Sequence, residues 1–367
     1  MRHPSEKILH LSVVLLFFFI SACHPPVTST DSPTPELLQT SSSTPIQIPA
    51  ATTTPPFQAA DPDPSPTTTS TSKTERRVTL MAVGDIMLGR TIGELIEEEG
   101  FEAPFLYTAE TLNQADLTIG NLECPISTQG TPEGKKYTFC APLAAGQSLA
   151  YAGFDLVSLA NNHTLDYGES ALQETMDTLA ENGILWAGAG MDADSAYQPV
   201  FIEINGLRLA FLAFMDIPLT EDFDYLSWEA GDNQPGVAWA HADKISECVR
   251  QAKVEADIVI VLVHNGYEIV QKVSSEQQEV AHLAIDSGAS LVIGSHPHVL
   301  QRIEEYNGGL IVYSMGNFVF DNFLFPPNYS AILSVELSPQ GVESYELIDV
   351  IVQLDGVPQI MPYDLDE

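Results

Sequence analysis

From Val78 onward, short apolar runs alternate with segments whose apolar residues recur at helical spacing. The runs have the length of buried strands, and the periodic segments have the length of helices. The expected strands are 78–83, 117–120, 156–160, 184–187, 258–263 and 290–293, and the expected helices are 92–98, 169–182, 242–256 and 275–287. This alternation predicts an α/β protein with buried sheets and helices outside them.

Glycine-containing turns indicate that the sheets are not purely parallel. Asn205-Gly206 has the character of a tight hairpin turn, and Asn307-Gly308-Gly309 precedes another return strand. The expected antiparallel segments are 201–204 with 207–214, a return strand at 310–313, and the alternating tail 331–353. We therefore expect mixed sheets within one folded domain, residues 78–367, which is long enough to bury one large core.

The N-terminal region has the pattern of a signal peptide. Basic residues precede the apolar stretch 8–20, which is too short to span a bilayer. The sequence Ile-Ser-Ala-Cys at 20–23 then matches a lipobox. We expect removal of residues 1–22 and a diacylglycerol anchor on Cys23, which would hold the protein outside the cytoplasm. Plain secretory cleavage beside an incidental cysteine is the alternative.

The segment 23–77 is dominated by Thr, Ser and Pro. Such a composition cannot bury enough apolar surface to offset the entropy lost on ordering. We expect a disordered tether that its prolines keep extended. An O-glycosylated stalk is an alternative that the sequence leaves open.

The chain is strongly acidic, with 14 Lys and Arg against 50 Asp and Glu and a formal net charge of -36. This balance argues against binding of nucleic acid or anionic lipid headgroups through basic patches. If the ligand is an anion, something other than Lys and Arg must bind it.

Three cysteines follow Cys23, namely Cys124, Cys140 and Cys248. Outside the cytoplasm, a Cys124–Cys140 disulfide is one interpretation, because the Gly/Pro-rich segment 130–134 between them resembles a turn. Three free, buried thiols are the other interpretation.

The polar residues gather where the expected strands end. These clusters are Gly84-Asp85, Asn121-Leu122-Glu123, Asn161-Asn162-His163, His264-Asn265 and Ser295-His296-Pro297-His298. In open α/β sheets, ligands bind at the carboxyl ends of the strands. Carboxylates, imidazoles and amide oxygens are together a donor set for divalent Zn, Mn or Fe. The sequence therefore predicts a shared polar site that binds one or two divalent metal ions.

The motifs that contain these clusters resemble, in order, the signatures of the CapA (poly-γ-glutamate capsule synthesis) family. They are Gly84–Arg90, Gly120–Glu123, Ala160–Gly168, His264–Glu268, Gly294–Val299 and Tyr313–Phe318, and the resemblance covers the chain from Val78 to about Asp321. That family is similar to calcineurin-like metallophosphatases. The resemblance implies a four-layer α-β-β-α sandwich with two mixed central sheets and a two-metal site at the strand ends.

The resemblance also implies roles for individual residues. Asp85 and His298 would bind the first metal, Glu123 would bridge, Asn162 and His264 would bind the second metal with His296 beside them, and His163 would be the general acid. Two metals would supply a nucleophile and neutralise charge on the substrate, which would explain how so acidic a protein binds an anion.

Two positions depart from the phosphatase pattern. Met87 stands where the Asp-x-His motif has its histidine, and Glu123 replaces a shorter bridging Asp. A thioether is a poor ligand for these metals, so phosphomonoesterase activity is not implied. Without metal, Asp85, Glu123 and His163 retain the groups for acid–base chemistry on an amide or an α-carbon.

Arg90, Asn121 and Asn317 are candidate substrate-binding residues. Arg90 has the chemistry to clamp a carboxylate or phosphate, but a helix-start residue paired with a nearby acid has the same signature. Asn317 interrupts an apolar run that otherwise reads as a core strand.

Three functions follow. The first is a surface lipoprotein of capsule or related polymer synthesis, with a peptide-like or anionic polymer as substrate and a membrane-bound capsule synthase as partner. The second is an envelope metallohydrolase unrelated to capsule. The third is a non-catalytic component of polymer binding or export. Retention of His264, His296 and His298 argues against the third, whereas Met87 favours it slightly.

Overall fold

The computed structural model describes residues 76–219, 222–321 and 326–361 of the chain. The predicted signal peptide, Cys23 and nearly all of the predicted tether lie outside these residues, so the expectations for them stay predictions. Among the described residues, no helix combines the length and the apolar character that crossing a membrane requires.

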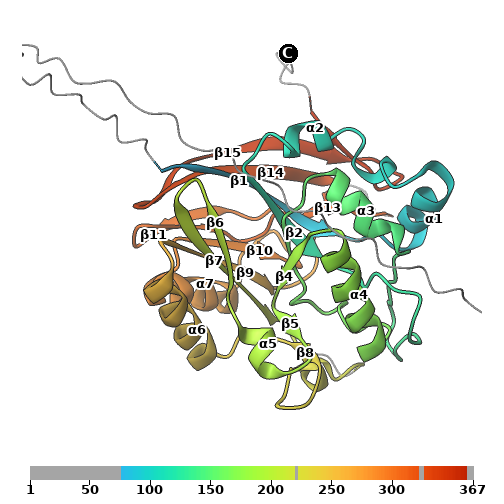
Figure 1. The fold of residues 1–367 in the computed structure, drawn as a ribbon, viewed down its shortest axis with the longest axis horizontal. Coiled ribbons are helices and arrows are strands. Elements are labelled where there is room, and N and C mark those ends of the chain that lie inside the picture. The colour runs from blue at the N-terminus through green and yellow to red at the C-terminus, as the bar shows by residue number, and fades with distance from the viewer. Residues whose placement is uncertain (1–75, 220–221, 322–325, 362–367) are drawn as a thin grey trace, which may run out of the picture. The chain divides into compact units, whose positions relative to one another are not determined.

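One mixed sheet is built from the first four strands and from strands near the C-terminus (Figure 1). Its spatial order is β16 (Pro358–Ile360), β15 (Gly341–Val352), β14 (Tyr329–Ser338), β1 (Val78–Ile86), β2 (Leu117–Leu122), β3 (Leu156–Ser158) and β4 (Leu185–Ala187), and β13 (Asn317–Val319) pairs with the end of β1. β1 to β4 are mutually parallel, whereas β14 to β16 are antiparallel.

The second mixed sheet comes from the middle of the chain. Its order is β11 (Ile303–Tyr306), β12 (Gly309–Val312), β10 (Leu291–Ser295), β9 (Ile258–Asn265), β7 (Leu207–Asp216) and β6 (Val200–Ile204). The four inner strands are parallel, and the two edge strands pair antiparallel through the predicted hairpins. Asn205 and Gly206 both have positive φ, as the turn of a tight hairpin requires. A small pair, β5 (Ala189–Gly190) with β8 (Gly236–Val237), lies apart from both sheets.

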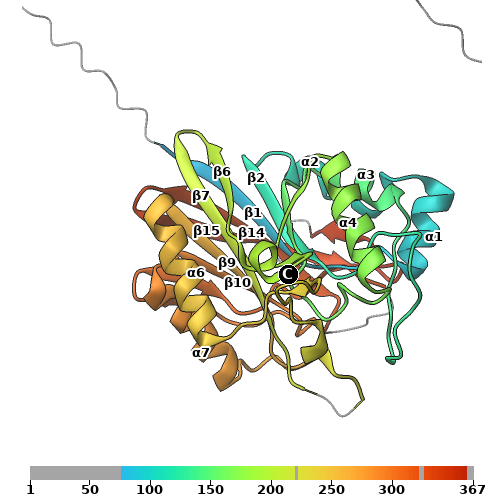
Figure 2. The same cartoon turned by 60° about the horizontal axis from the view of Figure 1, so that its bottom comes forward.

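Side-chain alternation along β7 and β9 explains why this sheet is covered on both faces. One set of positions, including Phe211 and Ile260, packs into the core shared with the other sheet. The intervening positions, including Val261, pack against α6 (Ala242–Glu255) and α7 (Ser275–Ser287). Because successive side chains of a strand point to opposite faces, one run of apolar residues fills two cores. Figure 2 shows α6 and α7 side by side on the outer face of this sheet.

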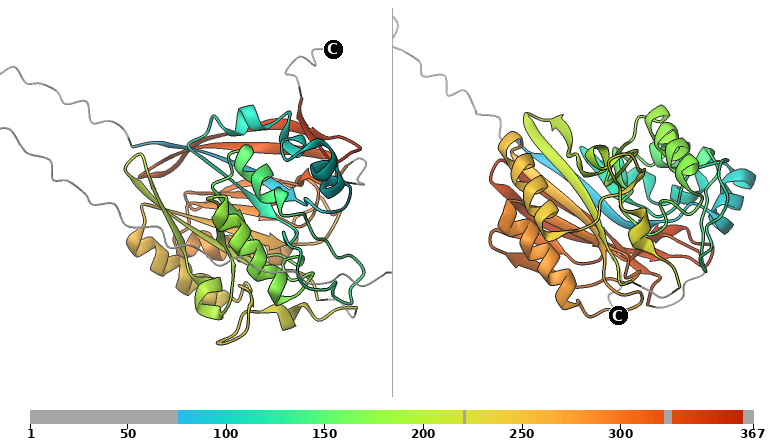
Figure 3. Two further views of the ribbon diagram at one scale, coloured as in Figure 1. Left: turned by 45° about the vertical axis from the view of Figure 1, so that its right-hand side comes forward. Right: turned by 90° about the horizontal axis from the view of Figure 1, so that it is seen from below.

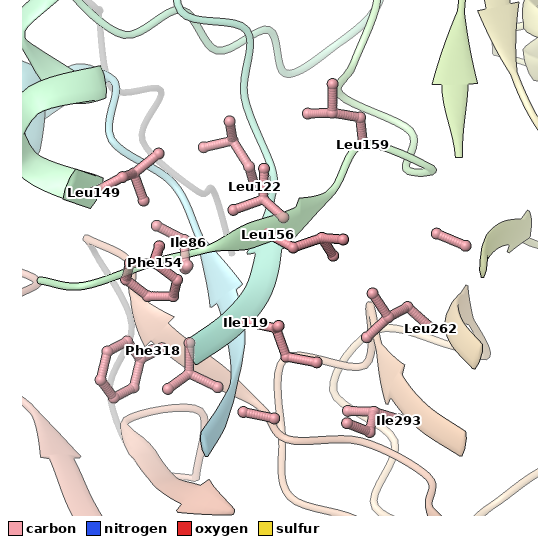
Figure 4. Close-up of a cluster of buried hydrophobic side chains, with 14 of the residues drawn as sticks. Ile86, Ile119, Leu122, Leu149, Phe154, Leu156, Leu159, Leu262, Ile293 and Phe318 are labelled. Carbon is pink, nitrogen blue, oxygen red and sulfur yellow. The ribbon is translucent and has the colours of Figure 1, made fainter. Parts of the chain in front are cut away.

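The other sheet is covered by helices on its own outer face. The helices of this layer are α1 (Arg90–Glu99), α3 (Ala144–Tyr151) and α4 (Glu169–Glu181). In Figure 4, Leu149 and Phe154 lie on one side of the first strands, and Leu262 and Ile293 of the second sheet lie on the other. Figure 3 shows the order helices, sheet, sheet, helices. The predicted α-β-β-α sandwich with two mixed sheets is therefore confirmed.

Each predicted helix and strand is present, with ends that differ by a few residues. Gly183, with φ of 76°, follows the end of α4, and a Ser274–Gln277 capping box begins α7. The elements that the pattern did not predict are short or weakly periodic. They are η1 (Ala103–Phe105), α2 (Ala109–Leu112), α3, α5 (Ala193–Tyr197), η2 (Tyr225–Trp228), β5, β8, β11, β13 and β16.

The described cysteines are free, as in the second interpretation, but Cys140 is only partly buried. Cys124, Cys140 and Cys248 are all free thiols, so the Cys124–Cys140 disulfide is not formed. Cys124 is buried, and its Sγ accepts a hydrogen bond of 3.3 Å from the backbone N–H of Leu88. Burial raises the pKa of the Cys124 thiol, so this side chain packs as a small apolar group.

Candidate metal centre

The polar clusters of both sheets come together at the carboxyl ends of their parallel strands. Asp85 lies near the end of β1 and pairs with Asn317 of β13, and His264 lies near the end of β9 and pairs with Ser295 of β10. The backbone at Gly84 closely approaches the backbone at Gly316. A Cβ on Gly84 would lie 1.9 Å from the carbonyl oxygen of Gly316. A glycine at position 84 is therefore required for the two strand ends to meet.

Asp85, Glu123 and His298 form the centre of the site. All three are buried, and one ligand atom from each lies within 4.8 Å of the others. Nδ1 of His298 is 3.1 Å from Oδ2 of Asp85, and its Nε2 is 3.7 Å from Oε1 of Glu123. Oε1 of Glu123 makes no hydrogen bond, although it is fully buried. Such an uncompensated oxygen is an available ligand position.

The charges at this centre are strongly coupled. Burial would raise the pKa of Asp85, but the hydrogen bond and positive charge of His298 lower it below its ordinary value. Burial lowers the pKa of His298, yet the hydrogen bond and charge of Asp85 raise it above its ordinary value. Burial and then the charge of Asp85 hold the pKa of Glu123 well above its usual range. In the metal-free site, Asp85 and His298 thus stabilise each other's charged forms, whereas the pKa of Glu123 is shifted toward its protonated form.

The two amides that were predicted to bind substrate, Asn121 and Asn317, contact these groups. Nδ2 of Asn121 donates to Oδ1 of Asp85 at 2.9 Å and lies 3.2 Å from Nδ1 of His264. Oδ1 of Asn317 is 2.8 Å from Nδ1 of His298. Both amides are buried. Contacts of this kind fix the orientation of metal-binding side chains, and a direct role in substrate binding stays a prediction.

Asn162, His264 and His296 lie beside the centre, and the metal-binding roles that the resemblance implied for them stay predictions. Nε2 of His264 is 2.7 Å from Oδ1 of Asn162, and its Nδ1 is 2.9 Å from Oγ of Ser295. The rings of His264 and His296 are 4.7 Å apart. Nδ1 of His296 is buried and makes no hydrogen bond. Burial and then the charge of His298 lower the pKa of His296 to about 3, so its ring is neutral and able to bind a metal.

His163 is held by a buried carboxylate and lysine. Its Nδ1 is 2.7 Å from Oδ2 of Asp166, and Nζ of Lys135 is 2.5 Å from Oδ1 of the same carboxylate. The imidazole also stacks on Phe139, with ring centroids 4.1 Å apart. Its Nε2 faces the centre, 3.9 Å from Oε1 of Glu123. Burial lowers the pKa of His163 to about 4, although the charge of Asp166 opposes this shift.

Arg90 is a helix-start residue paired with a nearby acid, which was the alternative to substrate binding. It begins α1, its guanidinium forms an ion pair with the buried carboxylate of Asp321, and its Cζ lies 4.5 Å from the ring centroid of Phe139. Substrate binding by Arg90 stays a prediction. Met87 is fully buried in the apolar core, where its Sδ accepts from the backbone N–H of Gly89 at 3.2 Å.

Three residues near the centre were not assigned roles from the sequence. Asp166 belongs to the same motif as His163, three positions later, and that spacing was a usable signal. Glu268 ends the motif that begins at His264 and approaches His296 and His298. Lys135 lies in a loop without a motif, and nothing in its sequence neighbourhood indicates that it becomes buried.

Comparison with known proteins identifies the family of this chain. A family model described as bacterial capsule synthesis protein PGA_cap matches residues 79–322. The capsule biosynthesis protein CapA of Bacillus anthracis is 31% identical over 303 residues, which is 80% of this chain and 72% of that protein. The PGA biosynthesis protein CapA of Bacillus subtilis (strain 168) is 31% identical over 73% of this chain and 70% of its own length.

A solved structure of a hypothetical protein from Thermus thermophilus matches with a TM-score of 0.48 and 18% identity, over 74% of this chain and 98% of that chain. The family model spans all of the strand-end clusters described above, and the two CapA relatives each match most of the chain. The chain therefore belongs to the PGA_cap family of bacterial capsule synthesis proteins.

Proposed function

We propose that this chain takes part in the synthesis of a poly-γ-glutamate capsule or a related envelope polymer, and that its buried centre is a metal-dependent, hydrolase-like site. Relatives named for capsule and PGA biosynthesis support the first part. The lipobox-like sequence at 20–23 supports a lipid anchor at Cys23 and a position outside the cytoplasm.

The observation that carries the proposed metal site is a pair of buried atoms without hydrogen bonds. Oε1 of Glu123 and Nδ1 of His296 are both in this state. Burying a polar atom without a partner is costly, and a carboxylate oxygen and an imidazole nitrogen are ligands of Zn, Mn and Fe. Asp85, Glu123 and His298 would hold the cation, with His296, His264 and Asn162 as further donors. When bound, such a cation polarises a carbonyl or phosphoryl oxygen and promotes attack by water.

His163 is the candidate for proton transfer. Asp166 occupies its Nδ1, which leaves Nε2 facing the centre. Because burial keeps the free ring neutral, Nε2 would take up a proton only when a negatively charged group approaches it. An anionic substrate would supply that charge, and the imidazolium would then protonate the leaving group.

The proposed cation, rather than the paired lysine beside His163, favours an anionic or peptide-like substrate. Nζ of Lys135 lies 2.5 Å from Asp166, and its side chain is 2% exposed. The charge of Lys135 is balanced by that carboxylate, so the proposed cation would supply the positive charge that an anion needs inside an otherwise acidic protein. A polymer of glutamate offers both amide bonds and carboxylates to such a site. A membrane-bound capsule synthase is the proposed protein partner, since a lipid anchor would hold the chain on the same surface.

Elemental analysis of the full chain, solubilised in detergent, tests the metal site. We expect near-stoichiometric Mn, Fe or Zn that is lost in Asp85→Ala and in His296→Ala. His241→Ala is the control, because that imidazole is exposed and pairs with Glu229 rather than with any of the proposed ligands. No metal in the wild type, even after reconstitution, would refute the metal-dependent mechanism.

A deletion strain tests the biological role. Complementation with the wild type should restore surface polymer, measured as glutamate released by acid hydrolysis of washed cells. Asp85→Ala and Cys23→Ala should fail to restore it although both proteins accumulate. Restoration by Asp85→Ala would instead favour a non-catalytic role in polymer binding or export.

A further inference from the structure

Glu268 lies on the loop that follows β9, at the solvent side of the buried centre. Its side chain is exposed, yet one of its carboxylate oxygens lies within 4.8 Å of a ring nitrogen of His296 and of one of His298. His298 also belongs to the group with Asp85 and Glu123. A second set of potential ligands therefore extends from the buried centre to the surface.

The two histidines of this set are fixed in place by unusual backbone conformations. His296 and His298 both have positive φ, at 94° and 56°, and both are buried. Residues other than glycine rarely adopt such angles, and the strain persists only where the surrounding structure imposes it. His296 adds a buried Nδ1 without a hydrogen bond, which is a donor atom that lacks a partner.

The loop that carries Glu268 is attached to the loop of the histidines. Ile269 has a φ of 62°, which is rare for a β-branched residue. Its backbone N–H donates to the carbonyl oxygen of Pro297 at 2.8 Å. Gln301 holds the following residue, because its Nε2 donates to the carbonyl oxygen of Val270 at 2.8 Å. These contacts keep the Glu268 carboxylate beside His296 and His298.

We propose that Glu268 is a metal ligand, which together with His296 and His298 binds a divalent cation at the solvent side of the centre. This inference rests on the proposed metal site and adds a ligand to it. Met87 supplies no donor to the centre because its thioether is packed in the core. Glu268 reaches His298, a member of that centre, from the loop after β9 and provides a carboxylate, which borderline and hard divalent cations prefer to a thioether.

The distances fit a cation after a small movement of one side chain. Ligand atoms about 2.0–2.2 Å from a cation are separated by up to about 4.4 Å when they lie opposite each other. The three ligand atoms lie within 4.8 Å of one another. The histidines are buried, whereas Glu268 is exposed and has the freedom to close the difference.

Titration calorimetry with MnCl₂ tests the proposal on the chelator-stripped full chain in detergent. We expect Glu268→Gln to weaken Mn²⁺ binding at least about tenfold, since losing a group that merely orients a ligand already costs about 10–100-fold. Glu279→Gln is the matched control, because Glu279 is an exposed residue of α7 and its replacement removes the same charge. It should bind Mn²⁺ as the wild type does. The Glu268→Gln deficit should persist in about 0.5 M salt, which screens long-range charge effects.

Mn²⁺ binding by Glu268→Gln that equals that of the wild type would overturn the assignment of Glu268 and leave the proposed metal site intact. A deficit that disappears in high salt would also overturn it, because Glu268 would then act only through its charge. Absence of Mn²⁺ binding in the wild type would refute the proposed metal site itself, and this inference with it.

Discussion

Lys135 forms a buried ion pair with Asp166, with Nζ 2.5 Å from Oδ1, and the second oxygen of Asp166 lies 2.7 Å from Nδ1 of His163. The lysine is 2% exposed and the carboxylate is fully buried. Burial lowers the pKa of Lys135, against the effect of the neighbouring Asp166 charge. The position of the proposed proton donor thus depends on a cation contributed by a distant loop.

Replacement of Lys135 by Met should destabilise the protein strongly. The change leaves Asp166 as a buried charge without its cation, and breaking a buried pair costs about 3–5 kcal/mol. Urea unfolding followed by circular dichroism measures the loss. Lys136→Met is the control, since that neighbouring lysine is fully exposed and its loss should change the free energy of unfolding by less than about 0.5 kcal/mol. Equal stability of the two variants would show that Lys135 does not compensate Asp166.

Gly84 should not tolerate a side chain. A Cβ at this position would lie 1.9 Å from the carbonyl oxygen of Gly316, and backbone at that distance has to move. Gly84→Ala should therefore lower the free energy of unfolding by about 3 kcal/mol or more, or prevent folding. Gly134→Ala is the control, because a Cβ there meets no atom within 4 Å.

The outcome of Gly84→Ala is measured by thermal unfolding and by soluble yield. A cooperative transition within a few degrees of that of the wild type would contradict the close approach of β1 and β13. If the variant folds with lower stability, weaker Mn²⁺ binding should accompany the loss, because Asp85 is the next residue.

The contribution of His296 to the stability of the metal-free protein should decrease as the pH is lowered. Burial, and then the charge of His298, lower its pKa from 6.5 to about 3. At this residue, the unfolded chain therefore binds more protons than the folded one between these values. The contribution of His296 to the free energy of unfolding is fully present above pH 6.5 and declines below it. The loss from this one residue is at most about 1.4 kcal/mol per pH unit. Glu123 acts in the opposite direction, since its pKa is raised.

His296→Gln removes this titration and leaves Glu123 in place. Urea unfolding in the presence of a chelator, between about pH 7 and pH 5, should show a steeper decline for the wild type than for the variant. The gap in stability between the two proteins should narrow as the pH falls. A gap that stays constant across this range would mean that His296 is not buried as a neutral ring.

The fold and the centre could largely be predicted because both depend on local patterns. The apolar runs at 258–263 and 290–293 identified parallel strands, and parallel strands bring His264 and Ser295 to one edge. The hairpin at Asn205-Gly206 followed from turn chemistry that needs no knowledge of the rest of the fold.

The contacts that the sequence did not reveal are long-range or depend on strained backbone. Lys135 reaches Asp166 from a Gly- and Pro-rich loop, which gives no sign of burial. Glu268 approaches the histidines on a loop in which Ile269 adopts a positive φ and donates a backbone hydrogen bond to Pro297. Neither the path of a loop nor the strain in a single residue follows from periodicity or composition.

A substitution of Asn317 distinguishes a residue that orients His298 from one that only binds substrate. Its Oδ1 lies 2.8 Å from Nδ1 of His298, so it orients the imidazole and leaves Nε2 to face Glu123 and a cation. Asn317→Ala should therefore weaken Mn²⁺ binding about 10–100-fold, which is the usual effect of losing a group that orients a ligand. Titration calorimetry on the chelator-stripped protein measures this, and a cooperative thermal transition shows that the fold is retained. If Asn317 were only a substrate-binding residue, as the sequence first suggested, Mn²⁺ affinity would stay unchanged, because no substrate is present in the titration.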